Sequence, residues 1–287
     1  MSAVCWSAAP KAEFHRFSWS ELNKPSLAKQ IEGVKRMSSD AWSSADYALA
    51  AGTLPTTDGL LEPTTTAAGC IEEIIFPDEG ELRIRKVVKR SNARTTGKHP
   101  SPKNRRIMQY ESFGELHVFL HLECMPEVIR YHEQPCKIVY REDGDLRLHY
   151  PDLLVEFADR KELWEVKRRS EAEKSDMLRR ADLMRQLVQW GYEYRVVIAE
   201  EYKIQPRLKN IAKLVRFGYH PISMSEREDI RLLPVRQQIL SWGQACSGVY
   251  GRRGREVMCR LALEGKLTFD VDAHWSPSTQ FSLREAL

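Results

Sequence analysis

The amino-acid sequence predicts a mixed α/β protein with an αβββαβ core and a small α-rich unit at its C-terminus. Three observations support this prediction. Between residues 110 and 203, segments with the period of a strand alternate with segments of helical period. The composition, with 42% hydrophobic and 29% charged residues, is that of a globular protein. The length of 287 residues is enough for about two domains.

Residues 1–70 are predicted to form a partly ordered N-terminal extension, because residues 38–69 are rich in Ser, Thr and Ala and contain no Lys or Arg. No segment approaches 18 consecutive apolar residues, and no basic flank precedes an apolar run at the N-terminus. We therefore expect a cytoplasmic protein without membrane contact. The six cysteines form no CxxC pair, which indicates reduced thiols rather than disulfides or a zinc cage.

Residues 71–109 are predicted to form a hairpin followed by a basic arm. Apolar residues at 71–76 and 82–88 flank a turn sequence at 78–80, which favours a β-hairpin. Residues 83–106 hold ten Lys or Arg and no Asp or Glu. We expect an extended loop that contacts DNA phosphates; the alternative is a solvated linker. The predicted DNA-binding residues are Lys89, Arg90, Arg94, Lys98, Lys103, Arg105 and Arg106.

The core begins with a helix and three strands. Apolar residues at helical spacing predict a helix over 110–124, which ends before Pro126. Alternation of apolar and polar residues predicts a half-buried strand over 136–141. Two further strands are expected at 149–157 and 162–167, joined by a tight turn.

A second helix and a last strand complete the core, residues 110–203. Ser170 and Glu173 have the spacing of a capping box, and Gly191 is the expected end of the helix. One stripe of this helix is predicted to be buried: Met177, Leu178, Ala181, Met184 and Val188. Residues 194–199 include the β-branched Val196, Val197 and Ile198 and are predicted to form a strand.

Residues 204–287 are predicted to form the small C-terminal unit. Its expected helices lie around 208–217, 234–242 and 255–264. Gly265 ends the last helix, and a strand with alternating Leu267, Phe269 and Val271 precedes a turn at Pro277 and a partner strand. A helix followed by a hairpin in an α-rich unit is the outline of a winged helix, a fold that serves as a DNA or partner interface.

Two carboxylates and a lysine are predicted to meet on the hairpin of the core. If its loop is centred between residues 158 and 159, Asp152 lies directly opposite Glu165. Lys167 shares the face of Glu165, because side chains alternate with a period of two along a strand. Like charges at this distance repel, so a cation is expected between the two acids.

This set of groups suits hydrolysis of a phosphodiester. Carboxylate oxygens are the ligands that Mg²⁺ prefers, together with water and phosphate oxygens. Lys167 can position the attacking water, help to deprotonate it or stabilise developing charge. Glu115, at the edge of the apolar stripe of the first helix, can reach a second metal ion. Against this interpretation, alternating Glu and Lys usually mark a solvated strand face; the opposed aspartate and the upstream acidic helix favour a catalytic site.

At these residues the chain resembles known nucleases. Pro151-Asp152 and Glu165-Val166-Lys167 in an αβββαβ core resemble the PD-(D/E)xK nuclease superfamily, which has a restriction-endonuclease-like fold. Residues 111–135, followed by the sequences HYPDLLV and WEVK, are similar to TnsA, the endonuclease subunit of heteromeric, Tn-seven-like transposases. The resemblance covers roughly residues 110–200.

The resemblance implies roles for individual residues. Glu115, Asp152 and Glu165, with the backbone carbonyl of Val166, would bind Mg²⁺, for which Mn²⁺ can substitute. Lys167 would be the catalytic lysine. Some family members have glutamine at the third acidic position, where this chain has glutamate. In addition, Gln134 lies in a Glu-Gln-Pro triplet that matches the family, and it is expected to support the site.

The resemblance also implies a function and partners. TnsA-like subunits cut the 5′ strands at the ends of a transposon in double-stranded DNA, so the protein is expected at the nucleoid. A DDE-type subunit resembling TnsB cuts and joins the 3′ strands, and an AAA+ ATPase resembling TnsC contacts the C-terminal region. The alternatives are a stand-alone PD-(D/E)xK restriction or repair nuclease and a non-catalytic DNA-binding assembly protein.

Three weaker candidates remain. His117, His121 and Cys124 share a helix, but no fourth ligand at zinc-site spacing follows, which favours ordinary packing or surface histidines. The glycine-rich, basic residues 248–254 lack a P-loop sequence and are either a flexible loop or a contact for DNA phosphates. Asp182 faces outward by helical spacing, yet the family has a functional acid near this helix.

Overall fold

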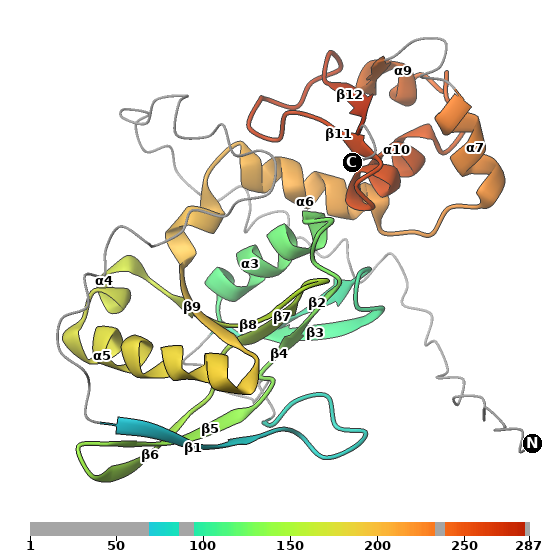
Figure 1. Cartoon of the computed structure of the whole chain (residues 1–287). Helices are drawn as coiled ribbons and strands as arrows, with labels where there is room; N and C mark the ends of the chain where they lie inside the picture. Colours follow the sequence, from blue (N-terminus) through green and yellow to red (C-terminus); the bar gives the residue numbers. More distant parts are fainter. Residues whose placement is uncertain (1–68, 86–94, 233–238, 285–287) are drawn as a thin grey trace, which may run out of the picture. The chain divides into compact units, whose positions relative to one another are not determined.

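A computed structural model of the chain describes residues 69–85, 95–232 and 239–284 (Figure 1). The described part is mixed α/β, as predicted, with a four-stranded sheet, two three-stranded sheets and a two-stranded hairpin. The predicted N-terminal extension lies outside the described residues, apart from its last two. Among the helices of the described ranges, none combines the length and the hydrophobicity needed to cross a bilayer.

The four-stranded sheet positions the predicted catalytic residues. Its strands, in spatial order, are β4 (Arg130–Glu133), β7 (Leu153–Glu156), β8 (Lys161–Lys167) and β9 (Glu193–Ile198). β8 and β9 are parallel, and the other pairs are antiparallel. The two central strands are buried along most of their length, because helices cover both faces of the sheet.

Helices on the two faces of this sheet enclose two separate cores. On one face lies α3 (Phe113–Cys124), and on the other lie α5 (Ser175–Met184) and the 3₁₀ helix η2 (Arg185–Trp190). Leu153 packs into the core under α3, whereas Leu154 packs into the core under α5. This alternation is the period of two expected of a strand, and it assigns each residue of the hairpin to one face.

The strand predicted at 136–141 is present, but it does not belong to the four-stranded sheet. It is β5 (Lys137–Glu142), the central strand of a sheet in which its neighbours are β1 (Gly69–Ile75) and β6 (Asp145–His149). The strand that lies beside β7 is β4, which was not predicted. The αβββαβ order is therefore interrupted by an additional β-ribbon.

The hairpin predicted from 71–76 and 82–88 is wrong in its described part. β1 pairs antiparallel with β5, and residues 82–85 form no strand. The turn itself forms, with the N–H of Glu81 donating to the carbonyl of Asp78 at 2.9 Å. Beyond it the chain turns away from β1, because the N–H of Ile84 donates to the carbonyl of Gln134 at 3.0 Å.

The basic arm is partly a β-hairpin rather than an extended loop. β2 (Gly97–Ser101) pairs with β3 (Arg106–Tyr110). His99 and Met108 lie opposite each other and are buried, which gives the hairpin an apolar side. The Ser101 hydroxyl accepts from the N–H of Asn104 at 3.0 Å and so closes the turn. Residues 86–94 of the arm, with predicted DNA contacts at Lys89, Arg90 and Arg94, lie outside the described ranges.

The second helix of the core is divided. A short helix, α4 (Arg169–Ala172), precedes α5, and its capping box uses the side chain of Glu171, not the predicted Ser170 and Glu173. Gly191 ends the helical segment at φ 79°, as predicted.

Three residues of the predicted buried stripe are in the core: Met177, Ala181 and Met184. Leu178 and Val188 are exposed, by 39% and 65%. The prediction at Val188 failed because the chain changes to a 3₁₀ helix at Arg185, and three residues per turn move the following side chains off a stripe of 3.6-residue period.

The C-terminal part is α-rich with a small sheet. After the 3₁₀ helix η3 (Ala199–Lys203) come α6 (Arg207–Gly218), α7 (Met224–Leu232), α9 (Trp242–Cys246) and α10 (Gly254–Leu263). The sheet has the order β10 (Ile239–Ser241), β12 (Gln280–Leu283), β11 (Leu267–Thr268).

Two of the three predicted C-terminal helices are confirmed, as α6 and α10, and Gly265 follows α10 at φ 71°. The helix predicted at 234–242 is wrong at its described end, where residues 239–241 are a strand, and α7 was not predicted. The strand predicted over Leu267, Phe269 and Val271 is only two residues long, because Phe269 turns into an aromatic cluster with Trp275. The winged-helix assignment stays a prediction.

Candidate active site

The register predicted for the core hairpin is confirmed. Leu153 on β7 pairs with Trp164 on β8, which is the register that places Asp152 opposite Glu165. Asp152 lies one residue before β7, and its Oδ2 accepts a hydrogen bond from the backbone N–H of Val166 at 2.8 Å. This hydrogen bond extends the pairing of β7 and β8 by one step, with the side chain of Asp152 in place of a backbone carbonyl. It holds the carboxylate at the end of β8.

Glu165 and Lys167 join Asp152 at this end of the sheet. The ammonium of Lys167 forms an ion pair with Glu165 Oε1 and lies 4.0 Å from Asp152 Oδ2. Glu165 is buried, whereas 26% of the Lys167 side chain is exposed. Both belong to the α5 face, because Leu163 on the same strand packs into the core under α5. Among the three residues, Lys167 therefore has the most exposed side chain.

Glu115 approaches from α3, on the other face of the sheet. Ser112 caps this helix, and its hydroxyl donates to Glu115 Oε1 at 2.9 Å. The N–H of Glu111 donates to Glu115 Oε2 at 2.9 Å. The first turn of the helix lies against β8 and η3: a Cβ on Gly114 would be 2.9 Å from the Cβ of Ala199 and 3.5 Å from Val166. Glycine at this position thus lets Glu115 come close to Asp152.

The three carboxyl groups influence one another electrostatically. Burial, and then the charges of Glu165 and Glu115, raise the pKa of Asp152 well above its usual value. Burial raises the pKa of Glu115 to about 7, and it also raises the pKa of Glu165, against the pull of Lys167. For Lys167, burial lowers the pKa, but Glu165 and Asp152 outweigh it and the net shift is upward. A cation among the acids would relieve this repulsion.

The carboxylate oxygens of the site are of the kind that binds a divalent metal ion, but they are not arranged around a single point. Within the described ranges, no three His, Cys, Asp or Glu side chains lie close enough to hold one ion. Nevertheless, Glu165 Oε2 is buried and has no hydrogen-bond partner, so it has a lone pair to offer. Asp152 and Glu115 also offer carboxylate oxygens, the ligand type that Mg²⁺ prefers. The role of the Val166 carbonyl stays a prediction.

Two residues beside Glu165 were not predicted. His149, at the end of β6, lies with Nε2 at 2.9 Å from the hydroxyl of Tyr194 and at 3.6 Å from Glu165 Oε2. Burial, with Arg180 and Lys167 contributing, lowers the pKa of His149 to about 3, so the imidazole is neutral. One indication in the sequence that His149 belongs to the site was its position three residues before Asp152. Its contact with Tyr194 on β9 could not be predicted, because it depends on the tertiary structure.

Gln134, predicted to support the site, contacts the backbone of Asp152. It adopts a left-handed backbone conformation with φ 47°, and its N–H donates to the carbonyl of Asp152 at 2.9 Å. Its side-chain oxygen accepts from Arg85 Nε at 2.7 Å. Arg85 also pairs with Glu111 at 3.2 Å and lies over the ring of Tyr150. Arg85, which connects the basic arm to the site, was not predicted.

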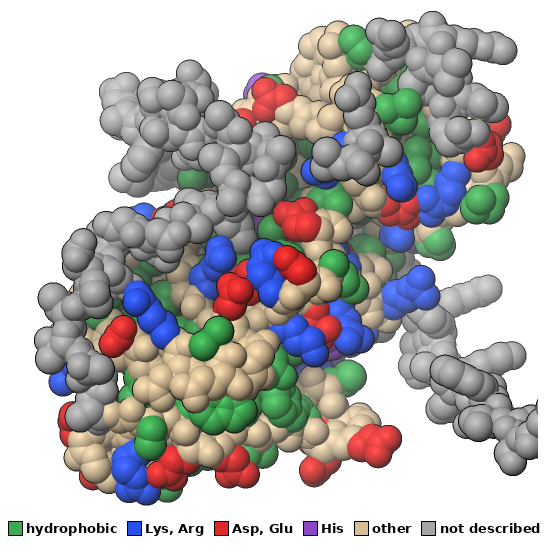
Figure 2. Space-filling model, viewed as in Figure 1, with side chains coloured by type: hydrophobic (Ala, Val, Ile, Leu, Met, Phe, Trp, Pro, Cys, Tyr) green, Lys and Arg blue, Asp and Glu red, His purple; other side chains and the backbone are tan. Residues whose placement is uncertain are grey.

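The described basic residues of the arm differ in their surroundings. Arg106 makes a two-point ion pair with the buried Glu133, at 2.9 and 2.6 Å. Lys103 donates to the carbonyls of Met125 and Val128. Lys98 and Arg105 are exposed, and Arg105 has a positive φ of 53°. On the face seen in Figure 2, Lys and Arg side chains are mixed with Asp and Glu and do not form one patch.

The weaker candidates are not assembled into a site. His121 Nδ1 contacts the carbonyl of His117 at 2.8 Å, an ordinary contact within a helix. Asp182 is half-buried and lies 3.8 Å from Arg185. In the glycine-rich segment 248–254, Arg253 pairs with Glu226 at 3.1 Å.

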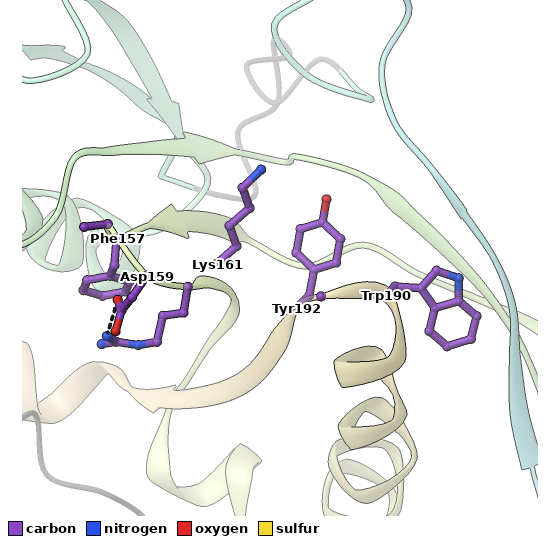
Figure 3. A pocket seen from close by; sticks show the side chains of 8 residues that line it. Phe157, Asp159, Lys161, Trp190 and Tyr192 are labelled. Atoms are coloured by element: carbon purple, nitrogen blue, oxygen red, sulfur yellow. Dashed lines mark hydrogen bonds and ion pairs between the residues drawn. The ribbon is translucent and has the colours of Figure 1, made fainter.

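An open cavity of about 360 Å³ lies at the opposite end of the core hairpin (Figure 3). It is lined by the turn between β7 and β8 and by Trp190 and Tyr192. Arg160 in this turn stacks on Phe157 and pairs with Glu162 at 2.6 Å. The cavity contains none of the predicted catalytic residues.

Comparison with known proteins agrees with the geometry. Residues 125–213, about a third of the chain, match the family model described as TnsA-like endonuclease N terminal. No curated protein matches the chain significantly. The matched segment contains Asp152, Glu165 and Lys167, and Glu115 precedes it. Residues 125–213 are therefore similar to the N-terminal domain of TnsA-like endonucleases, which confirms the resemblance found in the sequence.

Proposed function

We propose that this protein is the metal-dependent DNA endonuclease subunit of a heteromeric transposase, which cleaves the 5′ strands at transposon ends for cut-and-paste transposition. The observation that carries the proposal is the hydrogen bond from Val166 N–H to Asp152, which sets that carboxylate beside Glu165 and Lys167 inside the TnsA-like segment. The finer assignment to a PD-(D/E)xK core follows from the same three residues on one strand pair.

In this proposal the carboxylates of Glu115, Asp152 and Glu165, with the Val166 carbonyl, hold Mg²⁺ or Mn²⁺. The bound ion would polarise the phosphate oxygens and make water a better nucleophile. Asp152 is oriented by the Val166 N–H, and Glu115 by its contacts with Ser112 and the N–H of Glu111.

Lys167 supplies a positive charge next to the carboxylates of the site. Its pKa is raised by the neighbouring acids, so it is an ammonium at neutral pH. With part of its side chain exposed, it can donate hydrogen bonds to the attacking water or to the phosphate as negative charge develops there. Glu165 holds the amine in place.

The partners follow from the same proposal. Double-stranded DNA at the transposon ends would contact exposed residues of the basic arm, such as Lys98 and Arg105. A DDE-type, TnsB-like subunit would process the 3′ strands. An AAA+, TnsC-like ATPase would bind the winged-helix-like residues 204–287. The protein would then work in the cytoplasm at the nucleoid.

Nicking of labelled transposon-end DNA tests the proposal, with and without Mg²⁺ and with and without the DDE partner. Asp152→Asn keeps an acceptor for the Val166 N–H but removes the charge, so we expect cleavage to be abolished with the fold retained. Asp159→Asn, in the turn at the far end of the same hairpin, is the matched control and should cut like the wild type. Cleavage by Asp152→Asn at the wild-type rate would refute the assignment.

A further inference from the structure

Arg180 on α5 has no acidic partner among the described residues. Its Nε is buried and makes no hydrogen bond, and its Nη2 donates only to the thioether sulfur of Met177, at 3.2 Å. The preceding residue, Arg179, differs: it is exposed on the same helix and pairs with Asp176 at 2.6 Å. A half-buried guanidinium with unused donors is costly unless an anion completes its hydrogen bonds.

The side chain of Arg180 lies within electrostatic range of the proposed catalytic group. Its charge acts on Glu165, on Lys167 and on the neutral His149. α5 covers the face of the sheet to which Glu165 and Lys167 belong, opposite α3 and Glu115. Arg180 therefore lies on the same side of the sheet as Lys167.

The acids of the site do not satisfy this arginine. Glu165 Oε1 is paired with Lys167, and Asp152 Oδ2 accepts from Val166. The nearby Arg85 is different, because it already bridges Gln134 and Glu111. Arg180 thus has N–H donors that no described residue accepts from, and a ligand can use them.

We propose that Arg180 binds a phosphate of the DNA strand that the site cuts. A guanidinium offers donors in a planar fork that matches two oxygens of a phosphodiester, and the partial burial of Arg180 strengthens such a contact. The phosphate would complete the hydrogen bonds of Arg180 and lie within reach of Lys167. This inference rests on the proposed nuclease function and adds a substrate-binding residue to it.

Two measurements on the full chain test the role of Arg180. The first is the single-turnover nicking rate of Arg180→Gln, which should fall at least about tenfold, with Arg180→Lys recovering part of the rate. The second is DNA binding in the inactive Asp152→Asn background. There, Arg180→Gln should reduce the slope of log K against log salt by about one, as expected for one lost phosphate contact. Arg179→Gln is the matched control and should change neither quantity.

A modified substrate identifies the contact. A methylphosphonate that replaces one phosphate near the cut removes its charge. At the phosphate bound by Arg180, this replacement should slow the wild type but cause no further loss in Arg180→Gln. A purely structural role would instead lower the melting temperature and leave the two effects additive.

The outcomes separate the two proposals. If the wild type does not nick DNA, the nuclease assignment fails, and the salt slope still decides whether Arg180 meets a phosphate. If the wild type nicks DNA and Arg180→Gln matches Arg179→Gln in rate and salt slope, the role of Arg180 is refuted.

Discussion

His99 is a buried histidine on β2 that the site does not use. Its Nε2 has no hydrogen bond and lies 3.9 Å from Glu123 Oε1. That carboxylate is already occupied, since it accepts from the hydroxyls of Ser101 and Tyr131 and from the N–H of Lys103. Burial consequently dominates and lowers the pKa of His99 to about 4.

This shift predicts that His99 makes the protein acid-sensitive. An unfolded histidine titrates near 6.5, so between pH 6.5 and 4 the unfolded state binds the extra proton. The stabilisation is complete above pH 6.5 and is lost as the pH falls toward 4. Between pH 7 and 4, the wild type should lose about 3 kcal/mol more of its unfolding free energy than His99→Gln does.

Urea denaturation at several pH values measures the difference. Glu123 is present in both proteins, so its own titration largely cancels in the comparison. The exposed His274 provides the control, and His274→Gln should follow the wild-type curve. Parallel curves for the wild type and His99→Gln would show that His99 is not the titrating group.

At the level of single residues, the sequence predicted the groups that a local pattern can fix. Asp152, Glu165 and Lys167 were predicted to lie together because strand alternation and a short turn determine the register. Arg85 and the imidazole of His149 were missed as parts of the site. Their contacts join residues far apart in the chain, and no local period encodes such contacts.

Among the elements, length and regularity decided which were predictable. α3, β7, β8 and β9 are rich in apolar residues and were predicted within a few residues. β4 escaped notice because its four residues, Arg130–Glu133, contain one apolar side chain, Tyr131, and do not alternate. The hairpin of β2 and β3 was hidden by two prolines and by many charges, although Pro100 sits within β2.

The contact between α3 and β8 gives a prediction for an element. Gly114→Ala places a Cβ 2.9 Å from Ala199 Cβ, so the first turn of α3 must move, and Glu115 with it. We expect nicking to fall about tenfold or more. The change in stability should stay within about 1–2 kcal/mol, because the better helix propensity of alanine partly offsets the crowding.

A second substitution tests the cause. Ala199→Gly removes the opposing Cβ, so the double variant Gly114→Ala/Ala199→Gly should regain most of the nicking rate. If Gly114→Ala cuts like the wild type, the position of Glu115 is not set by this packing. If the double variant stays as slow as the single one, the loss has another origin.

For the whole molecule, the net charge of +4 conceals a concentration of positive charge at residues 83–106. Much of that charge is used internally where the structure describes it. Arg106 forms a two-point ion pair with the buried Glu133, and without it that carboxylate would keep only the longer ion pair with Arg83, at 3.3 Å. Arg106→Gln therefore weakens a buried ion pair and reports on folding rather than on DNA contact.

Lys98 and Arg105 are the better probes of DNA binding, because both are exposed and neither forms an ion pair within the described residues. Each contacted phosphate contributes about 0.9 to the slope of log K against log salt, so Lys98→Gln/Arg105→Gln should reduce that slope by about two. The stability should be unchanged, and the affinity should fall equally for transposon-end and unrelated DNA, since phosphate contacts do not read sequence. Arg179→Gln, exposed but far from the arm in sequence, should keep the wild-type slope. An unchanged slope in the double variant would mean that this hairpin of the arm does not lie on the DNA.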